Sequence, residues 1–129
     1  MSYVLAASST PSFALKGLVG YEFQPLKDKD FAVHLVEVYT GHDTFIISKA
    51  LTRIYYILEG TGVFTIDNQK YEVAPGLVVE VPPGVEYSYS GSMKLLLVSQ
   101  IHPIPLSMEM FSCAARSLTR RRFSASSPP

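Results

Sequence analysis

The chain has 129 residues, 47% of them hydrophobic and 12% aromatic, and equal numbers of acidic and basic side chains give a formal net charge of zero. This length and apolar content suffice for one domain with a buried core. No stretch is long and apolar enough to span a bilayer, and the first residues lack the pattern of a secretory signal. We therefore expect a cytoplasmic protein without membrane contact.

Charge and cysteine content narrow the functions further. Residues 1–104 carry seven Lys and Arg against ten Asp and Glu, whereas residues 105–129 carry four Arg and one Glu. The main part is mildly acidic, which argues against nucleic acid as its partner. Cys113 is the single cysteine and can form no internal disulfide. Because it lies beside no His, we expect a structural thiol without catalytic function.

The first 30 residues are predicted to form a leader and the first strand or strands. Residues 1–15 mix small, polar and apolar side chains, which is typical of a loosely held leader with a short edge strand at residues 3–6. Residues 15–23 are predicted to form a strand. Alternating Lys and Asp at residues 27–30 indicate a solvated turn.

A nearly unbroken apolar run at residues 31–39 predicts the next strand. Alternation places His34 on one face with Val36 and Val38. His34 is then either a cavity residue or a hydrogen-bonded structural histidine among aliphatic side chains. A turn follows at residues 40–44, and residues 45–56 are predicted to continue as strand.

The second half of the chain consists of short β-branched and aromatic runs separated by turn residues. A hairpin is predicted with its turn at Glu59 and Gly60, between runs at residues 53–58 and 63–66. Further strands are predicted at residues 71–73, 77–81, 87–89 and 94–100, separated by polar, Gly and Pro turns. Such spacing is typical of an all-β sandwich or barrel.

Two sets of spaced residues resemble the motifs of the cupins, which are small double-sheet β-barrels of the jelly-roll type. The first set fits the first cupin motif and consists of Gly41, Ile47, Lys49, Arg53 and Gly60. The second set fits the second motif and consists of Gly76, Pro82, Gly84, Tyr87 and Gly91. The resemblance covers about residues 31–100 and implies a cupin barrel at residues 31–104, preceded by the leader and strands of residues 1–30.

The resemblance also shows where this chain departs from metal-binding cupins. Their ligands are two His and a Glu in the first motif and a His in the second. Here those four places hold Ile47, Lys49, Arg53 and Tyr87. Apolar and cationic side chains do not bind divalent metals, so we expect no metal and no cofactor. His34 and His42 remain as an alternative pair of ligands.

The cupin frame, with strand alternation, directs Lys49, Arg53 and Tyr55 into the barrel. The predicted ligand-binding residues of this basic, phenol-lined pocket are Lys49, Arg53, Tyr55, Tyr87, Tyr89 and His34. The alternative is a bulge or one-residue shift that turns the two cations to solvent. If they point inward, they need an anion or a carboxylate partner. The candidate partners are Glu37, Glu80 and Glu86.

Three functions follow from this pocket. The first is binding of a small anionic metabolite, namely a carboxylate, sugar or sugar phosphate, held by Arg53 and Lys49. The second is a metal-free isomerase or epimerase of a sugar or keto acid, with His34, His42, Lys49 or Tyr87 as the base. The third is a structural or interaction barrel in which the cations only form ion pairs with glutamates.

Two regions lie outside the pocket. Ile54, Tyr56 and Leu58 form an apolar row on the opposite face of their strand, which predicts a homodimer or cover by residues 1–20. The Ser- and Arg-rich tail at residues 105–129 is predicted to be a flexible extension, removable without unfolding the barrel. The alternative is a short basic amphipathic helix. Its apolar positions would be Met108, Phe111, Ala115 and Leu118.

Overall fold

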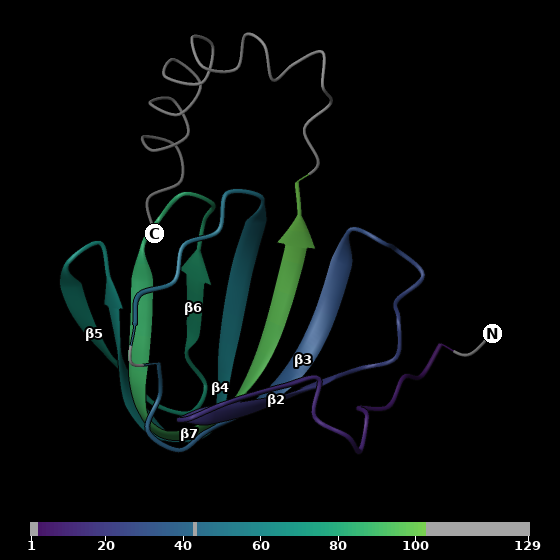
Figure 1. Cartoon of the computed structure of the whole chain (residues 1–129), viewed down its shortest axis with the longest axis horizontal. Helices are drawn as coiled ribbons and strands as arrows, with labels where there is room; N and C mark the ends of the chain where they lie inside the picture. The colour runs from purple at the N-terminus through teal and green to yellow at the C-terminus, as the bar shows by residue number, and fades with distance from the viewer. Residues whose placement is uncertain (1–2, 43, 103–129) are drawn as a thin grey trace, which may run out of the picture.

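The computed structural model describes residues 3–42 and 44–102, and this part of the chain is built from strands (Figure 1). The seven strands are β1 (Phe13–Leu15), β2 (Leu18–Glu22), β3 (Phe31–Val38), β4 (Leu51–Ile66), β5 (Gln69–Val73), β6 (Val78–Val81) and β7 (Tyr87–Ile101). Every pairing between them is antiparallel. The predicted all-β class is confirmed. Among the described residues, no helix is long and apolar enough to cross a membrane.

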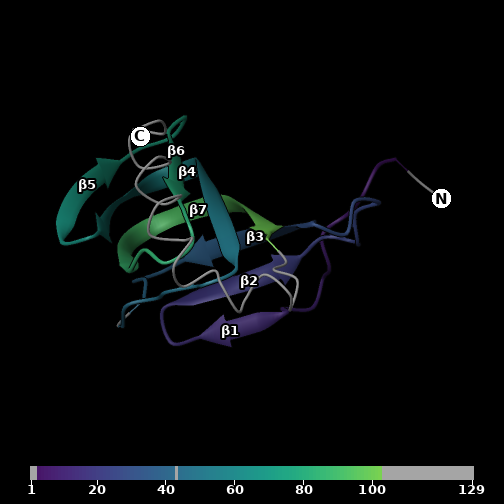
Figure 2. The ribbon, with the colours of Figure 1, turned by 90° about the horizontal axis from the view of Figure 1, so that it is seen from above.

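The last strand lies in the middle of the sheet. The strand order is β1-β2-β3-β7-β4-β5, with β6 paired to β4 beside this path. β7 pairs with β3 through its second half and with β4 along nearly its whole length. The sheet curls around a common interior, as the view from above shows (Figure 2).

β4 is one continuous strand of 16 residues, so the predicted hairpin at Glu59 and Gly60 is wrong. Its first half pairs with β6 and its second half with β5, while β7 follows both halves. Between the halves, a bulge shifts the register between Ile57 and Glu59. Gly60 has a positive φ of 82° and bends the strand without reversing it. The chain reverses instead at Asp67 and Asn68, which have positive φ values of 51° and 68° in a two-residue turn.

Three other predicted strands also differ from those in the structure. Residues 45–50 lie outside the named strands, and only Ile46 forms an isolated bridge, to Tyr87. At residues 3–6 there is no strand, and Ala7 bridges to Phe23 next to that segment. The predicted strand at residues 15–23 corresponds to β2 and the turn before it.

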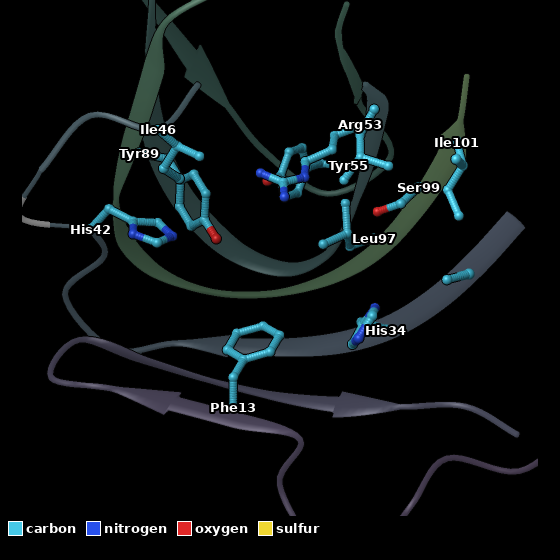
Figure 3. A pocket seen from close by; sticks show the side chains of 12 residues that line it. Phe13, His34, His42, Ile46, Arg53, Tyr55, Tyr89, Leu97, Ser99 and Ile101 are labelled. Atoms are coloured by element: carbon cyan, nitrogen blue, oxygen red, sulfur yellow. The ribbon is translucent and has the colours of Figure 1, made fainter. Parts of the chain in front are cut away.

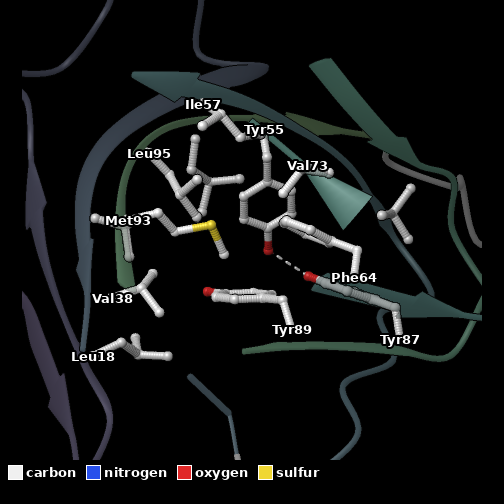
Figure 4. Close-up of a cluster of buried hydrophobic side chains, with 13 residues drawn as sticks. Leu18, Val38, Tyr55, Ile57, Phe64, Val73, Tyr87, Tyr89, Met93 and Leu95 are labelled. Atoms are coloured by element: carbon white, nitrogen blue, oxygen red, sulfur yellow. Dashed lines mark hydrogen bonds between the residues drawn. The ribbon is translucent and has the colours of Figure 1, made fainter. Parts of the chain in front are cut away.

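The core occupies one end of the barrel, where inward side chains of β2 to β7 meet (Figure 4). Its largest fully buried side chains are Tyr55, Tyr87, Phe64, Leu18, Ile57, Leu95 and Val36. A cavity lies beside the core. Its lining includes one residue from near an end of each of three strands, namely Ala32 of β3, Leu51 of β4 and Ile101 of β7. Cys113 and the tail at residues 105–129 fall outside the described residues.

Candidate functional site

The cavity beside the core has a volume of about 460 Å³ and a mostly apolar wall with a few polar groups. Its lining residues are Phe13, Ala32, His34, His42, Ile46, Leu51, Arg53, Tyr55, Tyr89, Leu97, Ser99 and Ile101. Strand alternation explains most of this list, because one row across the sheet joins Tyr55, Leu97 and His34. In Figure 3, Arg53 and Tyr55 lie across the cavity from Phe13 and His34.

Three polar side chains form a hydrogen-bonded chain along one wall. Arg53 Nη1 donates to Tyr87 Oη over 3.0 Å, and Tyr87 Oη lies 2.6 Å from Tyr55 Oη (Figure 4). Arg53 and Tyr55 are alternate residues of β4 and therefore face the same side. Tyr87 is only 1% exposed and stands behind the cavity wall.

An aromatic cluster fixes the phenols in place. Tyr55 contacts Phe64 and Tyr89 with ring centroids 5.2 Å and 5.3 Å apart, and Phe64 stacks on Tyr89 at 4.8 Å. His42 meets the Tyr89 ring edge-on at 4.9 Å. Such packing holds polar side chains with little rotamer freedom, which favours a preformed binding site.

The environment sets the charge of each group. Burial, and then the neighbouring Tyr89 and Tyr87, raise the pKa of Tyr55 well above its usual value. Burial and Tyr87 likewise raise the pKa of Tyr89. Burial opposes the charge of Arg53, but the hydrogen bond from Arg53 to Tyr87 and the nearby phenols raise its pKa overall. The hydroxyl groups of Tyr55 and Tyr89 are therefore neutral and the guanidinium of Arg53 is charged at neutral pH.

Among the described residues, two buried nitrogen atoms facing this region lack a hydrogen-bond partner, namely Arg53 Nε and His34 Nδ1. Both residues line the cavity, and no Asp or Glu of residues 3–42 and 44–102 lies in its wall. Lys94 and Glu59 form an ion pair, whereas Arg53 has no carboxylate partner within this part of the chain. The cavity thus holds a half-buried cation with an open donor, and the described residues supply no carboxylate to compensate it.

The family model for the Cupin domain matches residues 49–99, which include most of β4 to β7 and the Arg53–Tyr87–Tyr55 chain. The chain belongs to the cupin superfamily. Among curated proteins, it is 57% identical over 30 residues to the uncharacterized protein MJ1618 of Methanocaldococcus jannaschii. That match covers 23% of this chain and only about a quarter, 24%, of the relative's length.

Solved structures share this cupin fold at low sequence identity. Pac13, described as a unique nucleoside dehydratase, superposes with a TM-score of 0.71 at 22% identity, covering 81% of this chain and 86% of that one. Streptomyces PAC13 has also been solved with uridine as the variants H42Q, Y55F and Y89F, numbered in that protein. KdgF from Halomonas sp. has a TM-score of 0.62 at 14% identity, covering 77% of this chain and 90% of that chain.

The usual metal site of cupins does not fit the residues of this cupin. At the four ligand places, Ile47 is apolar and 55% exposed, Lys49 is exposed, Arg53 is a cation and Tyr87 is hydrogen-bonded to that cation. In the part of the chain that the structure describes, no group of three or more His, Cys, Asp or Glu could hold a metal ion. We therefore assign no step to a metal.

The structure brings together most of the residues predicted from the sequence. Arg53, Tyr55, Tyr89 and His34 line the cavity, and Tyr87 lies directly behind it. His34 is thus a cavity residue, although its role in binding stays a prediction.

The expectation that Lys49 points inward beside Arg53 is wrong. Lys49 is exposed and outside the cavity, because β4 begins only at Leu51 and strand alternation does not extend back to it. None of Glu37, Glu80 and Glu86 lines the cavity as a partner for the cations. Glu37 instead accepts a hydrogen bond from the Tyr39 hydroxyl over 3.0 Å.

Two cavity residues had no clear signal in the sequence. Phe13 comes from β1, and its ring lies over Gly20, where a side chain would collide with it. Ile46 comes from the segment before β4 and reaches the cavity through its bridge to Tyr87. His42 was considered only as a possible base or metal ligand, and it joins the wall through Tyr89. The unusual Gly at position 20 within a strand was the one available hint for Phe13.

Proposed function

We propose that this cupin binds a small sugar-bearing metabolite with an acidic group in the Arg53 cavity, without a metal. The observation that carries the proposal is the half-buried Arg53, whose Nε lacks a partner among the described residues in a cavity that no Asp or Glu of residues 3–42 and 44–102 lines. A buried cation is stable only with a counter-charge and hydrogen-bond acceptors. A carboxylate or phosphate supplies both, and guanidinium geometry suits these groups.

The remaining wall suits the sugar or base of such a ligand. Phe13, Tyr89 and His42 provide flat apolar surfaces, while Tyr55 and Ser99 provide hydroxyl groups. A volume of about 460 Å³ lies within the range of small-molecule sites. The uridine bound by the PAC13 variants supports the nucleoside class.

A second candidate is metal-free acid–base catalysis on the same ligand. It is favoured by the presence of an imidazole and protonated phenols on one wall, where His42 contacts Tyr89. An imidazole can accept a proton near neutral pH, and a phenol with a raised pKa can donate one. Similarity to a nucleoside dehydratase supports acid–base catalysis. The isomerase or epimerase expected from the sequence belongs to the same class of reaction.

Matched neutral and acidic probes test the proposal. We suggest calorimetric titration with uridine against uridine 5′-monophosphate and with glucose against glucuronate. The acidic member of at least one pair is expected to bind more tightly. Arg53→Gln should weaken its binding by roughly tenfold to a hundredfold, the value of a charge-assisted hydrogen bond. Lys70→Gln removes an exposed cation from β5 and serves as the matched control.

Three results would contradict the proposal. Equal affinity for both members of each pair would show that the ligand needs no acidic group. Unchanged binding of the acidic probe by Arg53→Gln would show that Arg53 does not contact the ligand. No binding at all, together with a higher melting temperature for Arg53→Met, would leave the structural barrel as the function. Solvent deuterium incorporation or release of water from a bound probe, measured by NMR, would establish the enzymatic candidate.

A further inference from the structure

The hydrogen-bonded chain of Arg53, Tyr87 and Tyr55 has a direction that the donor chemistry determines. An arginine guanidinium has N–H donors and no acceptor. Tyr87 Oη must therefore accept the hydrogen bond from Arg53 Nη1 at 3.0 Å. The short 2.6 Å contact between the two phenols can then be donated by either hydroxyl.

Only one of the two arrangements gives the hydroxyl proton of Tyr87 an acceptor among the described residues. If Tyr55 donated to Tyr87, the proton of Tyr87 would need another acceptor. Tyr87 is 1% exposed, and its hydroxyl bonds within the described residues are those to Arg53 and Tyr55. A buried donor without an acceptor has given up its hydrogen bond to water and gained none in the protein, which is unfavourable. If Tyr87 donates to Tyr55, the proton of Tyr55 is free to turn toward the cavity that Tyr55 lines.

We propose that Arg53 and Tyr87 are positioning residues that direct the hydroxyl proton of Tyr55 into the cavity, where it binds an acceptor oxygen of the ligand. The inference rests on the proposed function, because it assumes that the ligand occupies this cavity. It adds a specificity: the ligand group beside Tyr55 is a hydroxyl or carbonyl oxygen, not an N–H donor. Tyr87 takes part although it lies behind the wall.

The environment agrees with a donor role for Tyr55. Its pKa is raised, chiefly by burial, so the hydroxyl keeps its proton at neutral pH. The positive end of the chain at Arg53 polarises both hydroxyls in the same direction, and in such chains each hydrogen bond is strengthened by about 10–30%. Tyr89, another lining phenol, lies beside Tyr55 on the cavity wall, with their ring centroids 5.3 Å apart.

A double-mutant cycle with uridine as the probe separates positioning from packing. Tyr87→Phe keeps the ring and removes the hydroxyl, and it should weaken uridine binding by about threefold to tenfold, as for one neutral hydrogen bond. In a Tyr55→Phe background, Tyr87→Phe should have no further effect, because Tyr87 acts through Tyr55. Additive losses would overturn the inference. Tyr71→Phe removes an exposed phenol hydroxyl of β5 and is the control.

A second measurement needs no ligand and keeps the inference apart from the proposed function. Proton NMR of the ligand-free protein should show a nuclear Overhauser effect from the Tyr87 hydroxyl proton to the Tyr55 ring. This signal should disappear in Tyr87→Phe, shift in Arg53→Met and return toward the wild-type position in Arg53→Lys. A hydroxyl proton of Tyr55 directed at the Tyr87 ring would refute the proposed direction. Failure of uridine, uridine 5′-monophosphate, glucose and glucuronate to bind would instead count against the proposed function alone.

Discussion

Gly62 and Gly91 face each other directly across the pairing of β4 and β7, at the point where the sheet curls. Gly91 has a φ of 134°, and a Cβ atom there would lie 2.5 Å from the Gly62 Cα. The absence of side chains on both strands allows the backbones to bend together.

Gly91→Ala is therefore expected to lower the free energy of unfolding by about 3 kcal/mol or more, because backbone strain and a collision with backbone add together. Gly76→Ala is the control. Gly76 also has a positive φ, of 92°, but nothing lies within 4 Å of its added Cβ. It should lose only about 1–2 kcal/mol. Urea unfolding measures both, and equal losses would contradict the role of the Gly62–Gly91 pair.

Lys49→Gln is expected to leave both stability and binding of uridine 5′-monophosphate nearly unchanged. Lys49 is exposed and outside the cavity, and surface substitutions of this kind change stability by about 0.5 kcal/mol or less. Calorimetry beside Arg53→Gln provides the comparison. If Lys49→Gln weakened binding as much as Arg53→Gln, the cation pair expected from the sequence would be correct after all.

Stability should fall in mildly acidic solution because of His34. Burial lowers the pKa of His34, Glu22 opposes this shift, and Arg53 adds to it. Below about pH 6.5 the unfolded chain binds a proton at His34 that the folded chain does not, so the free energy of unfolding decreases as pH falls. The decrease ends once the folded state is protonated too. His34→Phe should flatten this part of a pH series of urea unfolding, and an unchanged slope would contradict the assignment.

A homodimer is expected through the outer face of the sheet. Leu35, Leu96, Tyr56 and Val78 are direct cross-strand neighbours on that face, and Tyr56 and Val78 are 39% and 59% exposed. Residues 7–20 lie at the opposite edge of the sheet, where β1 pairs with β2, and do not cover Tyr56. Sedimentation should give a dimer, and Tyr56→Glu a monomer, with Tyr71→Glu as control. A monomeric wild-type protein would exclude this interface.

Truncation after Ile104 should leave the barrel folded. β7 ends at Ile101. His102 is the last described residue, and its Nε2 forms a 2.7 Å hydrogen bond with Thr52 Oγ1. Every core residue in the described part of the chain precedes residue 102. A melting temperature within a few degrees of the full chain is the expected result. Loss of soluble protein would show that residues 105–129 contribute to the core.

The sequence predicted the fold better than the path of its strands. Gly and Pro residues marked the turns, and their spacing matched the cupin motifs over residues 31–100. The hairpin predicted at Gly60 was wrong because a glycine with positive φ occurs both in hairpin turns and in β-bulges. The two can be distinguished only by knowing which strand the flanking residues pair with. β4 keeps β7 as its partner on both sides of Gly60, which no local pattern reveals.

The site was predictable where strand alternation held. Arg53 and Tyr55 lie inside β4, so their common orientation follows from a period of two. Lys49 precedes β4, where the backbone is irregular, so the period of two does not apply and its predicted inward orientation was wrong. Phe13 reaches the cavity through the pairing of β1 with β2, which depends on tertiary structure and not on local sequence.

The central place of β7 has a consequence for how the chain folds. Both β3 and β4 have their main partner in β7, the last of the described strands, so residues 31–38 cannot complete their pairing before residues 93–100 are synthesised. Each such pairing closes a long loop before any contact repays the lost entropy. Proteins dominated by distant pairings fold slowly, in about milliseconds to seconds. Until β7 arrives, β3 and the first half of β4 have unpaired edges, and during synthesis these edges are where the nascent chain is most exposed to aggregation.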